Sequence, residues 1–359
     1  MSRNLGRFRY LLCFLGIALA LPGLGLVALA TVTPITLSGI IYLIGYGLLV
    51  TGLILSPWRP KYQRIVLIGG VVPIGLVAGV RVSSGLQQAS HIKDSVLPSA
   101  TETRWVNWLI DEQDSVSFGE GLLHLIGGVT EREHAGLVAA LSTGYAQANL
   151  ASGAFPSPVV STYLGLQKPS AFDAVVIEPD VERPTPIGVV FLHGYMGNVT
   201  LQCWQIAQAV EQIGAVTVCP STNWSGEWWQ PDGTPIIRAT LSYLRERGIQ
   251  QFYVGGFSNG GYGLGRLSTV LATESGLKGL FFIAGVSNEP AVRATGLPVL
   301  VIQGFDDERM PVGLARQFVA ELGEQATYVE LEADHFLIIK QSKQLQEGLG
   351  TWLKKLADH

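Results

Sequence analysis

The residue whose neighbours most clearly predict chemistry is Ser258, which lies in the run Gly-Phe-Ser-Asn-Gly at 256–260. Apolar residues at 252–255 predict a short strand before this run, and residues 262–272 have the pattern of a helix after it. A G-x-S-x-G sequence between a strand and a helix is typical of a strained turn that pushes the serine hydroxyl out at the top of a sheet. Glycine is expected at 256 and 260 because backbone crowds the turn and a Cβ would clash. We therefore predict that Ser258 is a nucleophile.

A serine hydroxyl attacks well only when a base takes its proton and a third group orients that base. At a site of this kind the partners follow along the chain in the order Ser, Asp or Glu, His. An apolar strand predicted over 297–304 leads into Asp306 and Asp307, and a strand predicted over 327–331 leads into His335. Four of the other histidines precede Ser258, and the last one ends the sequence. We predict that His335 is the base and that one of the two aspartates is the acid.

From about residue 170 to 355, these motifs resemble those of the α/β-hydrolase family. In that family the acid follows a strand in a G-x-x-D-x-x-V-P pattern, which residues 304–311 match with Met310 in place of Val. The resemblance implies that Asp307 is the acid and leaves Asp306 as the alternative. It also implies that Asp334, beside the histidine, braces the turn and takes no part in catalysis.

The resemblance also implies an oxyanion hole, which needs two N–H donors aimed at the developing negative charge. The family uses the residue after the nucleophile, here Asn259. Its second donor lies in an H-G-x-x-G loop after an earlier strand, which His193-Gly194-Tyr195-Met196-Gly197 matches. The carried-over donor is the Tyr195 N–H, and His193 is expected to brace this loop.

Strand and helix patterns alternate through the same part of the chain. The predicted strands cover 188–192, 215–219, 252–255 and 278–284, and helices are predicted between them at 201–213 and 236–247. Such alternation predicts a mostly parallel sheet with helices on both faces. The predicted fold class is α/β, a doubly wound and mostly parallel sheet, preceded by an N-terminal helical transmembrane region.

The N-terminal region is expected to cross a membrane. No Lys, Arg, Asp or Glu occurs from Tyr10 to Trp58, and apolar stretches at 11–30 and 35–55 are each about 20 residues long, enough to span a bilayer as helices. A signal peptide is the alternative for the first stretch, but its length and the second stretch directly after it favour a retained anchor. A third, uncharged stretch at 65–80 is of borderline length.

The side of the membrane on which the enzyme lies depends on this third stretch. Basic residues flank the first two stretches, and the positive-inside rule places them in the cytoplasm: Arg3, Arg7, Arg9, Arg59, Lys61 and Arg64. Three spans would put the catalytic domain outside the cytoplasm, and two would put it inside. Because residues 65–80 show no polar face, we expect a multi-pass protein with an extracytoplasmic catalytic domain.

We predict three regions along the chain: a transmembrane region at 1–82, a linker and helical segment at 83–157, and a catalytic domain at 158–359. Residues 83–99 are polar and are interpreted as the linker. Residues 130–133 form a capping box before a helix predicted at 134–149. This middle region could be a cap over the site, a stalk on the bilayer, or helices packed on the catalytic domain. Residues 156–177 are predicted to form one or two outer strands.

Two further features leave alternatives open. Trp224, Trp228 and Trp229 follow a predicted strand, so they could line a substrate pocket, face a membrane or pack against helices. Cys203 and Cys219 are expected near the carboxyl edge of the sheet. They could form a disulfide in an oxidising compartment or remain two buried thiols.

The function predicted from these residues is a membrane-anchored serine hydrolase that cleaves carboxylic esters through an acyl-enzyme on Ser258. The expected substrate is a small-molecule or lipid-like acyl compound. The same triad could serve a peptidase, a thioesterase or an acyltransferase, and a non-catalytic binding module is the alternative outside enzymes. No metal or other cofactor is predicted, since no Cys/His cluster or phosphate loop is present. The net charge of −4 argues against a nucleic-acid partner.

Overall fold

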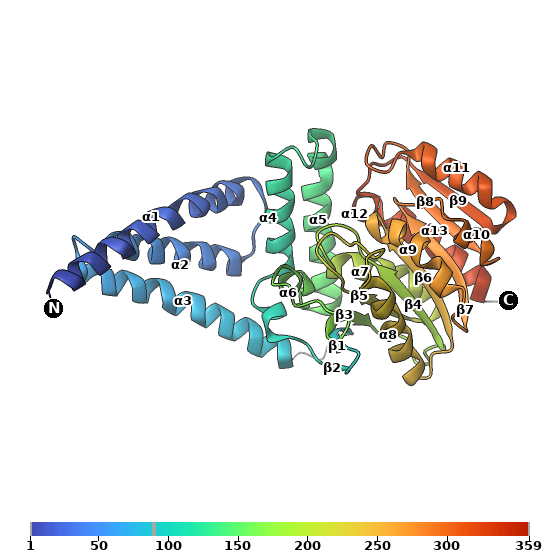
Figure 1. The fold of residues 1–359 in the computed structure, drawn as a ribbon, viewed down its shortest axis with the longest axis horizontal. Coiled ribbons are helices and arrows are strands. Elements are labelled where there is room, and N and C mark those ends of the chain that lie inside the picture. Colours follow the sequence, from blue (N-terminus) through green and yellow to red (C-terminus); the bar gives the residue numbers. More distant parts are fainter. Residues whose placement is uncertain (1, 88–90, 358–359) are drawn as a thin grey trace. The chain divides into compact units, whose positions relative to one another are not determined.

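The computed structural model describes residues 2–87 and 91–357, and the chain forms two compact units. One, which we call the helical unit, contains residues 2–87 and Trp108–Thr130. The other, which we call the sheet unit, contains residues 91–107 and 131–357. Figure 1 shows the three long N-terminal helices of the first and the central sheet of the second.

The helical unit is built on three long helices, each long and apolar enough to cross a membrane. They are α1 (Ser2–Val32), α2 (Leu37–Ile54) and α3 (Pro60–Gln87), and the unit also contains α4 (Glu112–Leu125). The candidate membrane span in α3 covers 61–85, which is longer than the uncharged stretch predicted from the sequence. At 1.5 Å per residue, its 25 residues span about 37 Å, more than the ~30 Å of a bilayer core.

The long helices run in alternating directions. A Cβ added at Gly16 of α1 would lie 2.8 Å from Leu53 near the end of α2, and one added at Gly52 of α2 would lie 2.7 Å from Leu67 early in α3. Small residues at such contacts let helix backbones approach closely, as is common in membrane helix packing. The start of α1, the end of α2 and the start of α3 therefore meet at one end of the unit.

Polar contacts hold the opposite end. The carboxylate of Asp114 in α4 accepts hydrogen bonds of 2.7 Å from both the backbone N–H and the hydroxyl of Thr36, the N-cap of α2. Arg81 of α3 donates to Asp111 at 3.0 Å, and the Tyr42 hydroxyl donates to the carbonyl of Leu109 at 2.7 Å. The segment around α4 thus caps the ends of α2 and α3.

The sheet unit has a nine-stranded sheet in the order β2-β1-β3-β5-β4-β6-β7-β8-β9. Neighbouring strands from β5 to β9 along this order run parallel, whereas β1 is antiparallel to both β2 and β3, and β3 is antiparallel to β5. The strands are β1 (Ile92–Leu97), β2 (Thr101–Glu102), β3 (Phe172–Ile177), β4 (Ile187–Leu192), β5 (Val216–Pro220), β6 (Gln251–Phe257), β7 (Leu277–Ile283), β8 (Val299–Gly304) and β9 (Ala326–Leu331).

Helices separate most of these strands, which confirms the predicted doubly wound α/β class. They are α5 (Glu131–Ser152), α6 (Pro158–Tyr163), α7 (Thr200–Val210), α8 (Gly233–Glu246), α9 (Asn259–Leu271), α10 (Pro290–Ala294), α11 (Val312–Leu322), α12 (Leu337–Lys340) and α13 (Ser342–Ala357). Short 3-10 helices occur at η1 (Trp105–Trp108), η2 (Glu211–Ile213) and η3 (Gly323–Gln325). Strands β3, β4, β5 and β8 are buried along their whole length, as expected for a sheet covered on both faces.

The segment interpreted as a polar linker at 83–99 instead contributes a strand, β1, to the sheet. Its period-2 pattern is hidden because the buried position between Ile92 and Val96 holds Asp94. That carboxylate accepts from Thr103 at 2.8 Å and from Asn107 at 2.6 Å, and burial raises its pKa. The outer strands predicted at 156–177 are also only partly right, because α6 precedes β3 there.

Candidate active site

The turn at Ser258 has the strained geometry that its sequence predicts. Ser258 lies between β6 and α9 with φ 54° and ψ −120°, a left-handed φ that non-glycine residues rarely adopt. A Cβ added at Gly256 would lie 2.4 Å from the carbonyl carbon of Gly260, and one added at Gly260 would lie 2.0 Å from the carbonyl oxygen of Leu192. Both glycines are therefore required by the close approach of the strands and the helix.

A chain of hydrogen bonds joins Ser258, His335 and Asp307, which come from the ends of three different strands. The Ser258 Oγ lies 2.9 Å from Nε2 of His335. The Nδ1 of His335 lies 2.9 Å from Oδ2 and 3.1 Å from Oδ1 of Asp307. All three side chains are buried, so the bonds between them are shielded from water. This geometry allows the imidazole to take a proton from the hydroxyl while the carboxylate holds its other nitrogen.

Backbone and side-chain donors orient the Asp307 carboxylate. Its Oδ1 accepts from the N–H of Arg309 at 3.0 Å and of Met310 at 2.9 Å. Its Oδ2 accepts from Nε2 of Gln303 at 2.9 Å, and the same amide donates to the Met310 carbonyl at 2.8 Å. Gln303 was not predicted as a site residue. The available signal was a buried polar residue near the end of an otherwise apolar strand.

Comparisons with known proteins find similarity in structure only. No protein-family model matches the chain, and no curated protein matches its sequence. Its structure is similar to those of an alpha-beta serine hydrolase homologue from Coxiella burnetii (17% identity, TM-score 0.41), Est1E from Butyrivibrio proteoclasticus (14%, 0.43) and the esterase domain of a Rhodothermus marinus protein (16%, 0.44). These matches cover 51%, 53% and 52% of this chain and 92%, 96% and 94% of the other chains. The sheet unit has a doubly wound α/β fold with a mostly parallel sheet.

The two neighbouring aspartates, Asp306 and Asp307, have different partners. The carboxylate of Asp306 forms an exposed ion pair with Arg132 at 2.6 Å, whereas the carboxylate of Asp307 is the one that contacts His335. Asp334 accepts from the Phe336 N–H at 3.0 Å and from Lys340 at 2.7 Å. These are the contacts of a residue that braces a turn.

The segments predicted to form the oxyanion hole border Ser258. Asn259 is the first residue of α9, and its side chain donates to the Ser225 carbonyl at 2.7 Å. A Cβ added at Gly194 would lie 3.0 Å from the Cβ of Ser258, so the loop containing Tyr195 passes directly beside Ser258. Left-handed backbone at Met196 and Gly197, with φ 78° and 87°, turns this loop into the next helix.

His193 fixes this loop from inside the protein. Its Nε2 accepts from the Thr222 N–H at 3.1 Å, so Nδ1 carries the proton and donates to the Gly194 carbonyl at 2.8 Å. Burial lowers the pKa of His193 to about 4, because the charged imidazolium would be desolvated. A neutral ring with both nitrogens engaged suits a bracing residue and not a base.

The three tryptophans predicted as pocket residues have different surroundings. Trp228 is 0% exposed and donates its indole N–H to the His193 carbonyl at 2.9 Å, so it cannot line an open pocket. The three tryptophans after a predicted strand suggested a pocket, but the sequence does not distinguish a fully buried tryptophan from one that lines a pocket. Trp224 is 45% exposed and packs edge-on against Tyr195 with ring centroids 4.9 Å apart, and Trp229 packs against Tyr262.

Of the two alternatives for the cysteines, the structure has the disulfide. Cys203 of α7 and Cys219 of β5 are bonded across Cα atoms 6.1 Å apart, and both are buried. The bond joins the helix after the Tyr195 loop to the strand before the tryptophan loop. Among the described residues, no group of three or more His, Cys, Asp or Glu side chains could hold a metal ion.

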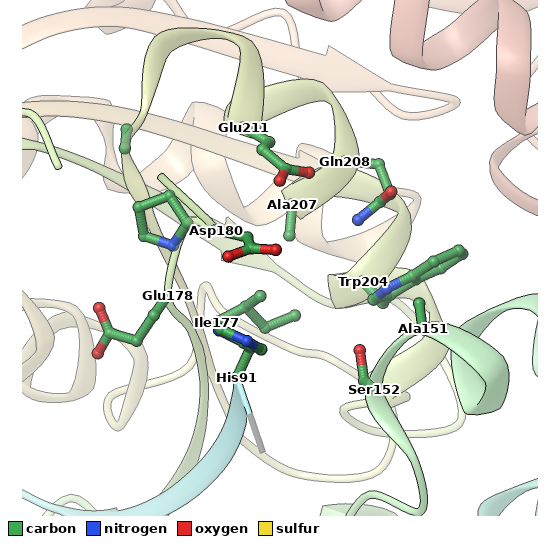
Figure 2. Close-up of a pocket in the computed structure, with 12 residues that line it drawn as sticks. His91, Ala151, Ser152, Ile177, Glu178, Asp180, Trp204, Ala207, Gln208 and Glu211 are labelled. Atoms are coloured by element: carbon green, nitrogen blue, oxygen red, sulfur yellow. The ribbon is translucent and has the colours of Figure 1, made fainter. Parts of the chain in front are cut away.

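A separate cavity of about 140 Å³ lies away from these residues, near the end of α7. Asp180, Glu211, Trp204 and Gln208 are among the side chains that line it (Figure 2). The residues around it include none of those predicted for the active site, so it plays no part in the chemistry considered below.

Proposed function

We propose that this protein is a membrane-anchored serine hydrolase that cleaves carboxylic esters through an acyl-enzyme on Ser258. The observation that carries the proposal is the unbroken hydrogen-bond chain from the Ser258 Oγ through His335 to Asp307 at a strained turn. Such an arrangement is recognised by geometry and roles, and it recurs on unrelated folds.

In the proposed mechanism the Ser258 Oγ attacks the acyl carbon while Nε2 of His335 removes its proton. Asp307 keeps Nδ1 of the imidazole facing it and stabilises the imidazolium that forms. The N–H groups of Tyr195 and Asn259 stabilise the negative oxygen of the tetrahedral intermediate. His335 then gives its proton to the leaving alcohol, and a water molecule activated by the same imidazole releases the acid from Ser258.

The surroundings favour an ester with an apolar acyl group over a peptide with a free amine. The side chains of Tyr195 and Trp224 are both partly exposed and pack on each other beside the nucleophile loop. The two aspartates next to Asp307 and His335 are already engaged, because Asp306 is paired with Arg132 and Asp334 with Lys340. A peptidase, thioesterase or acyltransferase on the same triad is the alternative.

We also propose three membrane spans and an extracytoplasmic catalytic domain. The alternating helices bring basic residues of the α1 start and of the α2–α3 connection to one end of the helical unit, whereas Asp111 and Asp114 hold the other end. The positive-inside rule assigns the basic end to the cytoplasm. The Cys203–Cys219 disulfide supports the same orientation, because disulfides persist in oxidising compartments.

Activity profiling tests the enzyme proposal. The full-length protein in detergent is treated with a fluorophosphonate probe and then assayed on p-nitrophenyl esters and aminoacyl amides. Ser258 should be labelled, esters should be the better substrates, and Ser258→Ala should lose both labelling and turnover by several orders of magnitude. Undiminished turnover in Ser258→Ala would exclude the proposed nucleophile, and a preference for amides would favour the peptidase.

Reporter fusions placed after Ser99 test the topology. A reporter that works only in the cytoplasm should be silent there, and one that works only outside should be active. A strong cytoplasmic signal would mean two spans and an inward-facing enzyme.

A further inference from the structure

The first turn of α5 is joined to the loop that carries Asp307. Glu133, in this turn, is only 6% exposed, and its two carboxylate oxygens accept from Nε and Nη2 of Arg309 at 2.6 and 2.8 Å. Two parallel N–H···O bonds between a guanidinium and a carboxylate fix orientation as well as distance. The pair connects residues 176 positions apart in the sequence.

Arg309 is at the same time part of the cradle of the acid. Its backbone N–H donates to Oδ1 of Asp307 at 3.0 Å, beside the donor of Met310. The guanidinium also lies over the ring of Phe336, 5.3 Å from its centroid, and Phe336 directly follows His335. Anchoring the Arg309 side chain therefore sets where a donor to the acid points and what packs beside the base.

A second contact joins the same turn to the loop of the base. Nζ of Lys340 donates to the carbonyls of Glu133 at 3.4 Å and Ala135 at 2.9 Å, and to Oδ2 of Asp334 at 2.7 Å. The Ala135 carbonyl is available because α5 kinks here, with ψ 117° at Ala135 and a left-handed φ of 80° at Gly136. Helix α12, which ends at Lys340, packs against α5.

We propose that Glu133 is a positioning residue that holds the acid and base loops in register through Arg309 and, by its backbone, Lys340. It touches neither the hydroxyl of Ser258 nor the imidazole, and its role rests on the proposed function of those groups. Because the helical unit ends at Thr130, the chain that leaves it enters the sheet unit at this contact. Glu133 therefore aligns the triad from the segment in which the chain returns to the sheet unit after α4.

A neighbouring ion pair provides a matched control. Arg132 and Asp306 connect the same two segments at 2.6 Å, but their side chains are 65% and 37% exposed. An exposed pair of this kind contributes little, because water screens it and two long side chains lose freedom in forming it. Arg132→Gln therefore removes a contact between the segments without disturbing the buried fork.

The test compares Glu133→Gln with Arg132→Gln in the full-length protein in detergent. For Glu133→Gln we expect kcat for a p-nitrophenyl ester to fall by about 10- to 100-fold, as a slightly misplaced triad would give, with KM unchanged. Arg132→Gln should keep the wild-type kcat. Glu133→Asp, which keeps the charge on a shorter side chain, should have an intermediate kcat, and the swapped pair Glu133→Arg with Arg309→Glu should recover part of the loss.

The outcomes separate this proposal from the one on which it rests. Wild-type kcat in a folded Glu133→Gln or Glu133→Asp protein would overturn the positioning role. The role would also be overturned if the melting temperature of Glu133→Gln fell together with its kcat and the swapped pair recovered neither. If the proposed function fails instead, Ser258→Ala will turn over ester as fast as the wild type. A loss of kcat in Glu133→Gln at wild-type melting temperature, with Ser258→Ala inactive, supports both.

Discussion

The two units of this protein place their large apolar side chains in opposite ways. In the helical unit such side chains are turned outward: Ile68 of α3 is 61% exposed, and Leu21 and Leu37 are exposed as well. In the sheet unit the strands bury theirs, and Ile302 of β8 is 0% exposed. Proteins folded in water rarely leave large contiguous apolar surfaces uncovered. The comparison indicates that the sheet unit folds by removing apolar surface from water, whereas the helical unit has a surface suited to lipid.

Buried carboxylates show a second contrast. Asp114 in the helical unit caps a helix by accepting from the N–H and the hydroxyl of Thr36, and burial raises its pKa. Asp307 in the sheet unit is held by three donors and presents both oxygens to His335. The same side chain is thus used to end a helix in one unit and, in our proposal, to orient a base in the other.

The largest expected loss of activity tests the contrast between the Asp307 and Asp114 carboxylates. Asp307→Asn should lower the ester hydrolysis rate by roughly 10³- to 10⁴-fold, because the amide no longer favours the correct tautomer of His335. Asp114→Asn should leave kcat unchanged, and so should Asp306→Asn, whose carboxylate faces Arg132. Steady-state kinetics on the three purified proteins measures this. A larger loss in Asp306→Asn than in Asp307→Asn would show that the acid is misassigned by one residue.

Two isoleucine-to-alanine substitutions, one in each unit, test the first contrast. Ile302→Ala should lower the free energy of unfolding by about 2–5 kcal/mol, since it leaves a cavity in a packed sheet. Ile68→Ala removes as many atoms from an exposed position and should change the free energy of unfolding by no more than about 0.5 kcal/mol. Denaturant titration in detergent compares them. Equal losses would mean that Ile68 is buried in an assembly.

The disulfide should matter less than the core. Cys203→Ser with Cys219→Ser opens a link between residues 16 positions apart and should cost about 3 kcal/mol of stability, mainly by freeing the unfolded chain. Cys13 of α1 has no such bond, so Cys13→Ala is the control in the helical unit. Thermal melts with and without reductant measure the difference. Identical melts would show that the thiols remain reduced in the isolated protein.

The last expected effect is confined to acidic pH and is absent at neutral pH. The pKa of His193 is lowered from 6.5 to about 4 in the folded protein, so the unfolded chain binds a proton that the folded chain refuses. His193 therefore costs no stability above pH 6.5, and the cost grows to about 3 kcal/mol as the pH falls to 4. The free energy of unfolding, measured as a function of pH, should no longer show this decrease between pH 6.5 and 4 in His193→Asn. An unchanged slope would mean that His193 is not buried as a neutral ring.

The strands and the serine turn could be predicted because they depend on local pattern. Continuous apolar runs marked β4, β5 and β8, and glycines at 256 and 260 marked a turn where backbone leaves no room for a Cβ. Strand β1 could not be predicted, because Asp94 occupies a buried position that only Asn107 and Thr103 make tolerable. The prediction that Trp228 lines a substrate pocket was wrong for a similar reason. Its burial depends on a contact with His193, which is distant in the sequence.

The sequence by itself determined which residues could do chemistry and in what order: a serine between glycines, an aspartate after one apolar strand and a histidine after the next. The motif register already favoured Asp307 over Asp306. Tertiary structure alone decided that Gln303 and Arg309 help to hold Asp307 and that Glu133 reaches Arg309 from α5. The physical reason is the sequence separation over which each kind of interaction acts. Strand, helix and turn preferences act over a few residues, whereas hydrogen bonds between buried side chains join positions that only the folded sheet brings within 3 Å.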